Sequence, residues 1–517
     1  MPRSFPAFMG TFPRLTPIQA RAFPVLLEGK HAVIGAPAAS GKTEAALTPL
    51  CERAMDRMPG SGVAILYIVP TRALANDIEV RCKGPASALG LDLVVRTGDR
   101  PSPVGKGQIG ILVTTPESFD SLLCRVPHAF DQLSAVVVDE AHLMDGTYRG
   151  DQLRILFRRL PCAPQMVAMS ATIGDAMGLG QRLFGRDCEL VLLTDARPIV
   201  CEDAENPLDA LRLLRAEGLS KAICFCNTRA KVEETCAQFA LRGPWPPDRV
   251  MAHHGSMGRR EREEVERAFR RWESAILVCT NTMELGIDVG DVDAVVLIGA
   301  PRDFASFLQR VGRGCRRKAG MLAVCVSEHE GDRGAFAGFR RALLSREEGP
   351  QPYTPDISVA VQQVFSMLFA RPAGMARGDL LRILAPLGSK EDLIAILDHL
   401  LSLGHIEAGG QDVLRASTGL MDMGERGTIH SNIPDEKELE VVDSTTSRLI
   451  GKVLGIAKDG YVTLAGRTWR ILGMRRGKLY ATPVPGDAAP PRFQGRAQVG
   501  AFYAYLPPAL RRGGTLD

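Results

Sequence analysis

The chain has 517 residues, too many for one hydrophobic core, so we expect three or four domains. Hydrophobic residues make up 45% of it and charged residues 24%, which is typical of a globular protein. It has no run of eighteen apolar residues and no signal-peptide pattern, so we expect it in the cytoplasm and away from membranes. The net charge of +4 neither requires nor excludes nucleic acid, so any binding track must be local.

The first predicted element is a helix that begins near residue 16. Thr16-Pro17 is typical of a helix start, with the threonine as N-cap and the proline in the first turn. Gln19 could offer its amide to an adenine edge, which presents one donor and one acceptor side by side. A glutamine exposed on the surface is the alternative, and the short distance to the next motif favours the binding role.

A phosphate-binding loop is predicted at residues 36–43. The loop follows the apolar run 31–35, ends in Gly41-Lys42-Thr43 and leads into a helical segment. Its N–H groups and the helix dipole would hold phosphates, Lys42 would reach the terminal ones, and the Thr43 hydroxyl would take Mg²⁺. An ordinary strand-to-helix turn is the alternative, because Ala36 stands where the strict pattern has glycine.

Four further apolar runs in the first 195 residues each end in polar residues. The runs and their polar ends are 63–69 before 70–74, 111–113 before 114–118, 135–138 before 139–142, and 166–169 before 170–172. Continuous apolar strands interleaved with helices predict a parallel sheet covered on both faces, with the polar clusters at its carboxyl edge. We therefore expect residues 1–195 to form one phosphate-loop α/β domain.

The acidic pair Asp139-Glu140 carries the predicted chemistry. Asp139, at the end of a buried strand, would hold Mg²⁺ directly or through water. Glu140 would orient and polarise a water for in-line attack on the γ-phosphate. A solvated acidic pair at a strand end is the alternative, and the phosphate loop upstream disfavours it.

A second alternation of strands and helices follows in residues 196–350. The predicted strands are 222–226, 250–253, 275–279 and 294–298, with a long charged helix from Arg259 to Trp272. This half has no glycine-lysine loop, so we do not expect it to bind a nucleotide independently. Most of the twelve cysteines lie in apolar runs and no C-x-x-C pair exists, so we expect buried thiols without a zinc ribbon or an iron–sulfur cluster.

Arginines recur at every third position near the end of this half. Arg310, Arg313 and Arg316 would share one face if the segment is a helix. That face could neutralise charge that develops on the γ-phosphate, as an arginine finger does. A basic surface helix is the alternative.

Taken together, the motifs resemble those of superfamily 2 helicases and follow that family's order. They are Gln19 and residues 36–43, 70–73, 115–117, 139–142, 170–172, 280–288 and 309–316. The sequence Glu-Leu-Gly-Ile-Asp at residues 284–288 and the chain after residue 350 are most similar to the Lhr (large helicase-related) group. The resemblance covers about residues 10–330 and implies two tandem RecA-like domains, 1–195 and 196–350.

The resemblance also implies roles for individual residues in an enzyme that uses ATP and Mg²⁺. Residues of the nucleotide site would be Gln19, Ala38, Ala39, Ser40, Gly41, Lys42, Thr43 and Asp288. The metal would lie at Thr43 and Asp139, and the catalytic residues would be Lys42, Asp139, Glu140, Gln309, Arg313 and Arg316. Contacts to the nucleic-acid backbone would come from Thr71, Arg72, Thr115, Thr228, Arg229 and Thr280. Coupling of nucleotide state to domain movement would involve His142, Ser170 and Thr172.

Two positions depart from the family pattern. Ala39 stands where the phosphate loop usually has glycine, and Cys315 stands where the last motif usually has glycine. Alanine adds only a methyl group and is tolerated where φ is negative, whereas a thiol between arginines could be unusually acidic. Neither position removes a catalytic group, so we expect a working but slow ATPase.

Residues 351–424 predict a winged-helix module. Three helical segments, 357–369, 378–385 and 390–403, precede a short hairpin that opens at Gly404. The third segment carries Glu391, Asp392 and Asp398, which disfavours direct reading of bases. By resemblance, such a module braces the two domains and the strand track.

Residues 425–517 predict a small antiparallel β-barrel-like domain with a partly flexible tail. The expected strands are 438–442, 450–454, 461–464, 468–472 and 479–483, several of them separated by glycine turns. Tyr461, Trp469, Arg470 and Tyr480 could form a stacking face for single-stranded bases. A core position for Trp469 is the alternative.

The leading hypothesis is an ATP-dependent translocase that moves along nucleic acid and unwinds duplexes. The resemblance suggests single-stranded DNA, 3′-to-5′ movement and a role in repair or defence, with RNA as an open alternative track. A nucleotide-gated clamp, or an ATPase that remodels RNA or protein without processive unwinding, is the second hypothesis. A scaffold without ATPase activity is disfavoured because Lys42, Asp139, Glu140 and Arg313 are all present. The sequence identifies no protein partner.

Overall fold

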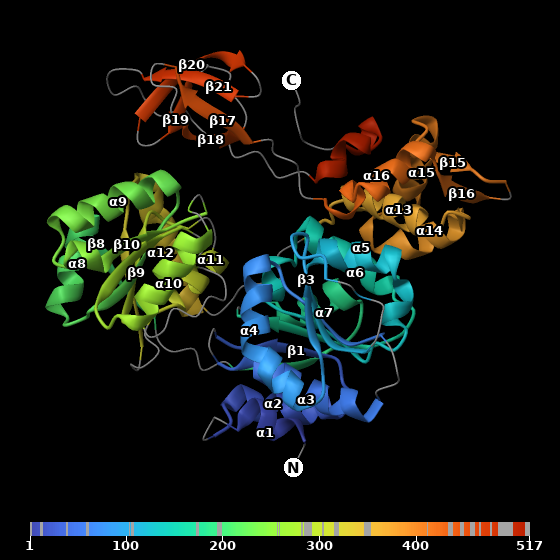
Figure 1. The fold of residues 1–517 in the computed structure, drawn as a ribbon, viewed down its shortest axis with the longest axis horizontal. Helices are drawn as coiled ribbons and strands as arrows, with labels where there is room; N and C mark the ends of the chain where they lie inside the picture. Colours follow the sequence, from blue (N-terminus) through green and yellow to red (C-terminus); the bar gives the residue numbers. More distant parts are fainter. Residues whose placement is uncertain are drawn as a thin grey trace. The chain divides into compact units, whose positions relative to one another are not determined.

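The fold is that of a computed structural model with two compact units (Figure 1). Unit 1 comprises Met1–Ala196, Arg346–Ile433 and Val499–Asp517, and unit 2 comprises Arg197–Ser345 and Pro434–Gln498. The structure describes residues 3–10, 14–37, 40–57, 62–102, 104, 108–171, 175–193, 199–255, 257, 259–280, 283, 292–301, 304–314, 320–345, 353–410, 412–432, 438–444, 449–454, 461–464, 467–475, 478–483 and 500–511.

The first domain of unit 1 is built on a seven-stranded parallel sheet of order β3-β4-β2-β5-β6-β1-β7. The strands are β1 (Ala32–Gly35), β2 (Gly62–Ile68), β3 (Leu93–Arg96), β4 (Gln108–Thr114), β5 (Ala135–Val138), β6 (Gln165–Ser170) and β7 (Glu189–Leu192). The helices are α1 (Ser4–Met9), α2 (Pro17–Leu27), α3 (Lys42–Arg57), α4 (Arg72–Ala88), α5 (Pro116–Arg125), α6 (Tyr148–Arg158) and α7 (Ala176–Phe184), with short turns η1 (Pro127–Phe130) and η2 (Ala141–Leu143). Two separate apolar clusters, one on each face of this sheet, show that helices cover both faces, as predicted.

Two strands of this sheet, β3 and β7, were not predicted, and both are edge strands. In β3 buried and half-buried residues alternate, and β7 begins with two exposed residues. The central strands β1, β5 and β6 are buried at every position and were predicted. An edge strand needs fewer apolar residues than a central strand, so its hydrophobic pattern is harder to find in the sequence.

The second RecA-like domain, in unit 2, has a six-stranded parallel sheet of order β10-β11-β9-β12-β13-β8. Its strands are β8 (Ile199–Ala204), β9 (Lys221–Cys226), β10 (Val250–His253), β11 (Ala275–Cys279), β12 (Ala294–Ile298) and β13 (Met321–Val326). Its helices are α8 (Pro207–Ala216), α9 (Arg229–Arg242), α10 (Arg259–Arg271), α11 (Phe304–Val311) and α12 (Glu330–Ser345), with the turn η3 (Pro247–Arg249). The predicted class of two parallel-sheet RecA-like α/β domains is therefore confirmed.

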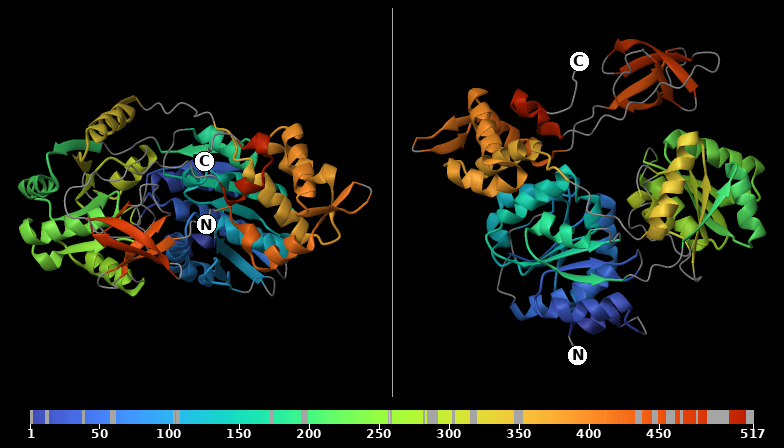
Figure 2. Two further views of the ribbon diagram at one scale, coloured as in Figure 1. Left: turned by 90° about the horizontal axis from the view of Figure 1, so that it is seen from above. Right: turned by 180° about the vertical axis from the view of Figure 1, so that it is seen from behind.

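A helical module completes unit 1. It contains α13 (Ser358–Ala370), α14 (Arg377–Leu384), α15 (Lys390–Ser402) and α16 (Thr418–Glu425), the turns η5 (Ala385–Leu387) and η6 (Thr428–His430), and a three-stranded antiparallel sheet of β14 (Met375–Ala376), β16 (Val413–Ala416) and β15 (Ile406–Ala408). The three predicted helices and the hairpin are present. Residues 358–369 of α13 are all buried, because the helix packs on α5 and α6 of the first domain on one side and on its own module on the other (Figures 1 and 2).

Residues 500–511, near the end of the chain, also belong to this module. They form η7 (Ala501–Tyr505) and η8 (Pro508–Leu510), and they bury Phe502 and Leu506 in the apolar cluster around Phe365. Asn432 holds this segment, since its carbonyl accepts from Ala501 N at 3.0 Å and its side chain accepts from Phe502 N at 3.1 Å. This stretch of the expected flexible tail is therefore packed core.

The β-rich part of unit 2 is a five-stranded sheet of order β18-β17-β21-β20-β19. Its strands are β17 (Glu438–Asp443), β18 (Leu449–Leu454), β19 (Tyr461–Leu464), β20 (Arg467–Arg475) and β21 (Lys478–Pro483). The expectation of purely antiparallel pairing was wrong at one position, because β17 pairs with β21 in parallel. Three strands lie between the two in the chain, long enough for a crossover connection. Arg470 is exposed and Tyr480 half-buried, whereas the side chains of Tyr461 and Trp469 lie outside the described residues.

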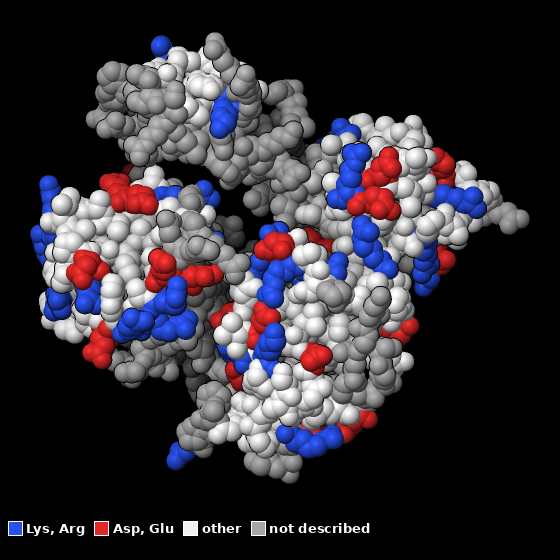
Figure 3. All heavy atoms as spheres, viewed as in Figure 1, with Lys and Arg blue, Asp and Glu red and all other residues white. Residues whose placement is uncertain are grey.

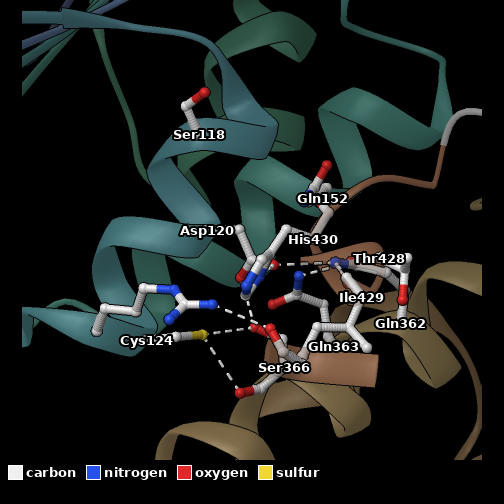
Figure 4. A network of polar contacts seen from close by, with 12 residues as sticks. Ser118, Asp120, Cys124, Gln152, Gln362, Gln363, Ser366, Thr428, Ile429 and His430 are labelled. Carbon is white, nitrogen blue, oxygen red and sulfur yellow. Dashed lines mark hydrogen bonds and ion pairs between the residues drawn. The ribbon is translucent and has the colours of Figure 1, made fainter. Parts of the chain in front are cut away.

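A buried polar network joins the helical module to the first domain (Figure 4). At its centre, fully buried Asp120 of α5 accepts hydrogen bonds from Arg159 (2.8 Å), Ser366 (2.6 Å), Gln362 (3.0 Å) and His430 (3.1 Å). Although burial opposes ionisation, the hydrogen bond from His430 and the charge of Arg159 keep the pKa of Asp120 below its usual value. The carboxylate thus ties α13 and η6 to the first domain.

Candidate active site

The predicted phosphate loop lies between β1 and α3, and residues at the start of α2 form hydrogen bonds to it. Gly41 has φ of +86°, and a Cβ there would lie 2.4 Å from Gln19 Nε2, so only glycine fits without strain. Gln19 Nε2 donates to the Gly41 carbonyl at 3.3 Å, and its Oε1 accepts from Thr16 N at 2.9 Å. The Thr16 hydroxyl donates to the Ser40 carbonyl at 2.9 Å. Gln19 therefore ties the helix start to the loop.

Lys42, the first residue of α3, is buried inside the loop. Its Nζ donates to the carbonyls of Ala36 at 2.7 Å and Pro37 at 3.1 Å. Among the described residues its hydrogen-bond partners are these two backbone carbonyls, so an anion that enters the loop would find a buried cation close by. Thr43, the next residue, is also buried.

Asp139 follows β5 and is buried beside Tyr67 of β2. Its Oδ2 accepts from the Tyr67 hydroxyl at 2.7 Å, and its Oδ1 accepts from Glu140 N at 2.9 Å. Burial and the charge of Glu140 raise the pKa of Asp139 to about 6, against the lowering effects of Tyr67 and of Lys42. A nearby divalent cation would favour the ionised form and lower this pKa.

Glu140 adopts the left-handed backbone conformation, with φ of 45° and ψ of 47°. Non-glycine residues rarely adopt this conformation, and such strain concentrates at functional sites. Its Oε2 is buried without a hydrogen bond from any described residue and lies 3.7 Å from His142 Nδ1. His142 Nδ1 in turn lies 3.1 Å from Ser170 Oγ at the end of β6. The structure thus brings Glu140, His142 and Ser170 together.

These residues fit the phosphates and Mg²⁺ that the sequence predicts. The hydroxyl of Thr43 and the carboxylate of Asp139 are hard oxygen ligands, and the pKa of Asp139 reflects a negative charge without a full counter-charge. Asp120, Cys124 and His430 form a second group whose ligand atoms lie within 4.8 Å of one another. There both carboxylate oxygens already accept protein hydrogen bonds, one of them from Arg159, so this group is part of the polar core described above.

The threonines expected at the nucleic acid prove to be helix caps. Thr71, Thr115 and Thr228 are the N-caps of α4, α5 and α9, and their hydroxyls accept from backbone N–H groups three residues on. All three follow strands of the parallel sheets, so they lie at the carboxyl edges. The neighbouring Arg72 is exposed and lies 3.6 Å from Asp99. Sequence alone did not assign these capping roles.

Arg149 in the first turn of α6 links two of these caps and was not predicted from the sequence. Its Nε and one terminal nitrogen donate to the two oxygens of Glu117 at 2.7 and 3.1 Å, and the other terminal nitrogen donates to the Pro70 carbonyl at 2.7 Å. Glu117 lies in the first turn of α5, and Pro70 precedes Thr71. The partners are far apart in sequence, so no local pattern indicates the contact.

The predicted site residues of the second RecA-like domain lie in unit 2. Thr280 follows β11 and is buried, and Thr228 and Arg229 follow the adjacent strand β9. Gln309 lies in α11, but this helix ends at Val311, so Arg313 occupies the turn that follows. The expectation that Arg310 and Arg313 share a helix was therefore wrong. After α11 the chain forms a tighter turn, in which Arg313 N donates to the Arg310 carbonyl and Gly314 N donates to the Val311 carbonyl. Arg310 donates to Asn227 at 3.0 Å.

Several predicted site residues lie outside the described residues. They are Ala38, Ala39, Thr172, Asp288 and Arg316, together with Cys315. Every described cysteine is a free thiol, and most are buried, as predicted.

Comparison with known proteins identifies both RecA-like domains. A model described as DEAD/DEAH box helicase matches residues 16–178, and one described as Helicase conserved C-terminal domain matches residues 206–318. The ATP-dependent helicase Lhr-Core of Methanocaldococcus jannaschii is 27% identical over 91% of this chain and 62% of its own length. The chain thus spans about three fifths of that relative.

Solved structures share the fold. The helicase Lhr of Mycobacterium smegmatis, bound to single-stranded DNA and AMP-PNP, matches with a TM-score of 0.71, 24% identity, and coverage of 84% of this chain and 62% of that chain. The DUF1998 helicase MrfA, bound to DNA and AMPPNP, matches with a TM-score of 0.70, 21% identity, and coverage of 94% and 73%. Among the described helices, none has the length and apolarity needed to span a membrane.

Proposed function

The chain belongs to the Lhr group of superfamily 2 helicases, and from this premise we propose that it hydrolyses ATP to move along nucleic acid and unwind duplexes. The observation that carries the proposal is Glu140. Its carboxylate is held at the end of a buried strand by a left-handed turn, with one buried oxygen that has no hydrogen bond from a described residue. A general base needs a free oxygen in a fixed direction.

The residues of the first domain would divide the work of hydrolysis. Lys42 would leave the carbonyls of Ala36 and Pro37 for the terminal phosphates, and Gln19 would read the adenine. Thr43 and Asp139 would hold Mg²⁺, which neutralises phosphate charge when bound. Glu140 would orient the attacking water and accept its proton.

The second domain would complete the site. Gln309, Arg313 and Arg316 would supply polar and cationic groups to the γ-phosphate, and Asp288 would contact the nucleotide. Ser170, Thr172 and His142 would couple the nucleotide state to movement between the domains. The hydrogen-bond distance between Ser170 and His142, next to Glu140, supports this role.

We infer that the track is single-stranded DNA, with 3′-to-5′ movement and a role in repair or defence. The Lhr protein of similar fold that was solved with single-stranded DNA supports the DNA track. Thr71, Arg72, Thr115, Thr228, Arg229 and Thr280 would contact the backbone. Helix N-termini bind phosphates well, and Thr71, Thr115 and Thr228 each cap one, which supports these contacts.

A nucleotide-gated clamp on nucleic acid, or an RNA-remodelling ATPase, is the second candidate. Basic and acidic side chains are interspersed on the face drawn in Figure 3. On the first domain, Arg100 forms an ion pair with Glu79 at 2.6 Å and Arg81 forms one with Glu44 at 2.7 Å. A broad basic surface would instead have favoured non-specific binding.

The test is steady-state ATP hydrolysis without nucleic acid, with single-stranded DNA and with single-stranded RNA, each at several strand lengths. Glu140→Gln should bind ATP but hydrolyse it about 10²-fold to 10⁴-fold more slowly, because the general base is lost. Stimulation by DNA that grows with strand length, and is absent in the variant, would support a translocase. Stimulation that saturates on short strands would indicate a clamp, and a preference for RNA would change the track.

A further inference from the structure

The side chain of Arg149 connects the start of α6 with the start of α5 and with Pro70, which lie 32 and 79 residues away in the sequence. Arg149 lies in the first turn of α6, which begins shortly after the Asp139-Glu140 turn. It forms a two-pronged ion pair with Glu117 and a hydrogen bond to the Pro70 carbonyl. The side chains of Arg149 and Glu117 are only 18% and 17% exposed. A planar guanidinium in this arrangement fixes distance and direction together.

Both partners stand directly beside a helix N-terminus. Pro70 precedes Thr71, the N-cap of α4, and Glu117 follows Thr115, the N-cap of α5, by two residues. Arg149 therefore sets the spacing between two helix N-termini at the carboxyl edge of the sheet. Two such N-termini at a fixed spacing could bind two phosphates of one strand, because each has N–H groups without an intrahelical partner, only one of which bonds to its threonine cap, and a positive dipole end.

The position of Arg149 depends in turn on the acidic turn. Thr147, the N-cap of α6, donates to the Met144 carbonyl at 2.6 Å and accepts from Arg149 N at 3.2 Å. Gly150 lies so close to this turn that a Cβ there would be 2.4 Å from the Met144 carbonyl oxygen. The turn η2 lies between Glu140 and Met144. A displacement of the acidic turn would therefore carry Arg149 with it.

We propose that Arg149 is a positioning residue that sets the spacing of the α4 and α5 N-termini for a nucleic-acid backbone and links this spacing to the Glu140 turn. Arg149 is not one of the residues assigned above to the nucleotide or the metal, and its side chain donates to Glu117 and to the Pro70 carbonyl. Its effect passes through Pro70 and Glu117. The inference rests on the proposed function, because it assigns part of the strand-binding surface of the same first domain.

The test compares Arg149→Met and Arg149→Lys in the full chain with Arg154→Met as the matched control. Arg154 also lies in α6, but its recorded hydrogen bond is to the Pro386 carbonyl, away from both caps. For Arg149→Met we expect about a tenfold or greater rise in the DNA concentration at half-maximal ATPase stimulation, with the KM for ATP changed less than about threefold. Binding of a fluorescent single-stranded oligonucleotide should weaken in parallel. Arg149→Lys should lie between, because a lysine cannot form the two-pronged pair.

Thermal unfolding of each variant separates an effect on positioning from an effect on folding. Glu117→Gln, which removes the charge of the partner of Arg149, is measured alone and in the double variant Glu117→Gln/Arg149→Met. If Arg149 acts through Glu117, the double variant should weaken DNA binding no more than Arg149→Met alone. Unchanged DNA binding in Arg149→Met would overturn the inference, as would equal weakening in Arg154→Met. If the wild-type protein neither binds DNA nor RNA nor responds to either, the proposed function itself fails, which this design distinguishes.

Discussion

At the scale of residues, the two carboxylates of the acidic turn have different surroundings. Asp139 accepts hydrogen bonds on both oxygens, whereas one buried oxygen of Glu140 has no hydrogen bond from the described residues. Burial and the charge of Glu140 raise the pKa of Asp139 to about 6. Since its ordinary value is 3.8, ionised Asp139 destabilises the nucleotide-free protein at neutral pH. Such a cost is common where a site is kept ready for a ligand.

Asp139→Asn should therefore stabilise the nucleotide-free protein while it abolishes hydrolysis. The difference between 3.8 and about 6 corresponds to about 3 kcal/mol at neutral pH, from which a weakened hydrogen bond to Glu140 N subtracts. We expect the unfolding midpoint of unit 1 to rise by a few degrees in calorimetry. Asp145→Asn is the control, because it removes an ion pair with Arg182 at 2.6 Å and should not stabilise. A lower midpoint for Asp139→Asn would contradict the reasoning.

His430 should make the stability of unit 1 depend on pH above neutrality. Burial alone would lower the pKa of His430, but its hydrogen bond to Asp120 and the neighbouring Cys124 raise it to about 9. The folded pKa lies above the ordinary 6.5, so the stabilisation is complete below pH 6.5 and is lost as pH rises through about 9. We expect up to about 3 kcal/mol of unfolding free energy to disappear in this window.

Denaturant unfolding at pH 7 and pH 9.5 measures this loss. Arg159 and Cys124 also face Asp120, but arginine keeps its charge throughout this range. The matched variant is His430→Asn, whose amide can still donate to Asp120 without titrating. The idea fails if His430→Asn shows the same pH dependence as the wild type.

At the scale of elements, α6 and α13 join the first domain to the helical module. Arg159, directly after α6, donates to Asp120 of α5 and to Gln363 and Ser366 of α13. Gln152 of α6 donates to the His430 carbonyl at 2.9 Å, and Asp151 accepts from Asp356 N at 2.8 Å. Because α13 is buried from residue 358 to 369, this interface resembles a protein core.

Arg159→Met should destabilise unit 1 strongly. It removes one of the two cationic partners of the buried Asp120 carboxylate, and because His430 remains we expect a loss near the lower end of the about 3–5 kcal/mol typical of a broken buried pair. The double variant Asp120→Asn/Arg159→Met removes both charges and should recover part of the loss. Chemical unfolding of the two variants gives the measurement, and equal destabilisation in both would show that the ion pair is unimportant.

The elements that sequence reasoning predicted well are those whose signal is local. β1, β5 and β6 are continuous apolar runs, and the phosphate loop and acidic turn are short motifs that end strands. β3 and β7 were not predicted, because buried and half-buried residues alternate in β3 and β7 begins with two exposed residues. The parallel β17–β21 pair depends on strand order, which no local pattern encodes.

The same distinction applies within the site. Lys42, Asp139 and Glu140 were predicted because their neighbours in sequence are also their neighbours in space. Arg149 and Tyr67 were missed because their partners lie 32 to 79 residues away. Thr71 and Thr115 were predicted at the correct edge, but their capping hydrogen bonds became visible only in the fold.

At the scale of the whole molecule, unit 1 is assembled from three separate stretches of chain. The second RecA-like domain lies between the first and second stretches, and the β-rich sheet lies between the second and third. The second and third stretches meet at Asn432, whose carbonyl accepts from Ala501 N at 3.0 Å. Both ends of the β-rich insertion therefore leave unit 1 at one point.

Replacement of residues 434–498 by a short glycine-serine linker should leave unit 1 folded. Asn432 and Ala501, which lie within two residues of the ends to be joined, are hydrogen-bonded to each other, so the linker closes a small loop at little entropic cost. Thermal unfolding and binding of a fluorescent ATP analogue would measure the outcome. A truncation at residue 498 is the control, since it removes the buried Phe502 and Leu506 and should lower the unfolding midpoint. If unit 1 failed to fold in the linker variant, the β-rich insertion would be required for its folding.

The three-stretch construction of unit 1 also has a consequence in time. A ribosome completes the first domain early, but Gln362 and Ser366 are made about 165 residues later, and His430 reaches the Asp120 carboxylate only after residues 197–429 have been made. At 5–20 residues per second, that interval is about 10–50 s. Until α13 (Ser358–Ala370) has been made, the nascent first domain exposes the surface of α5 and α6 that this helix later covers. Chaperones that bind exposed apolar surface would therefore find this protein during synthesis, and Phe502 and Leu506 would fill their places in the apolar cluster only once residues 500–511 have been made.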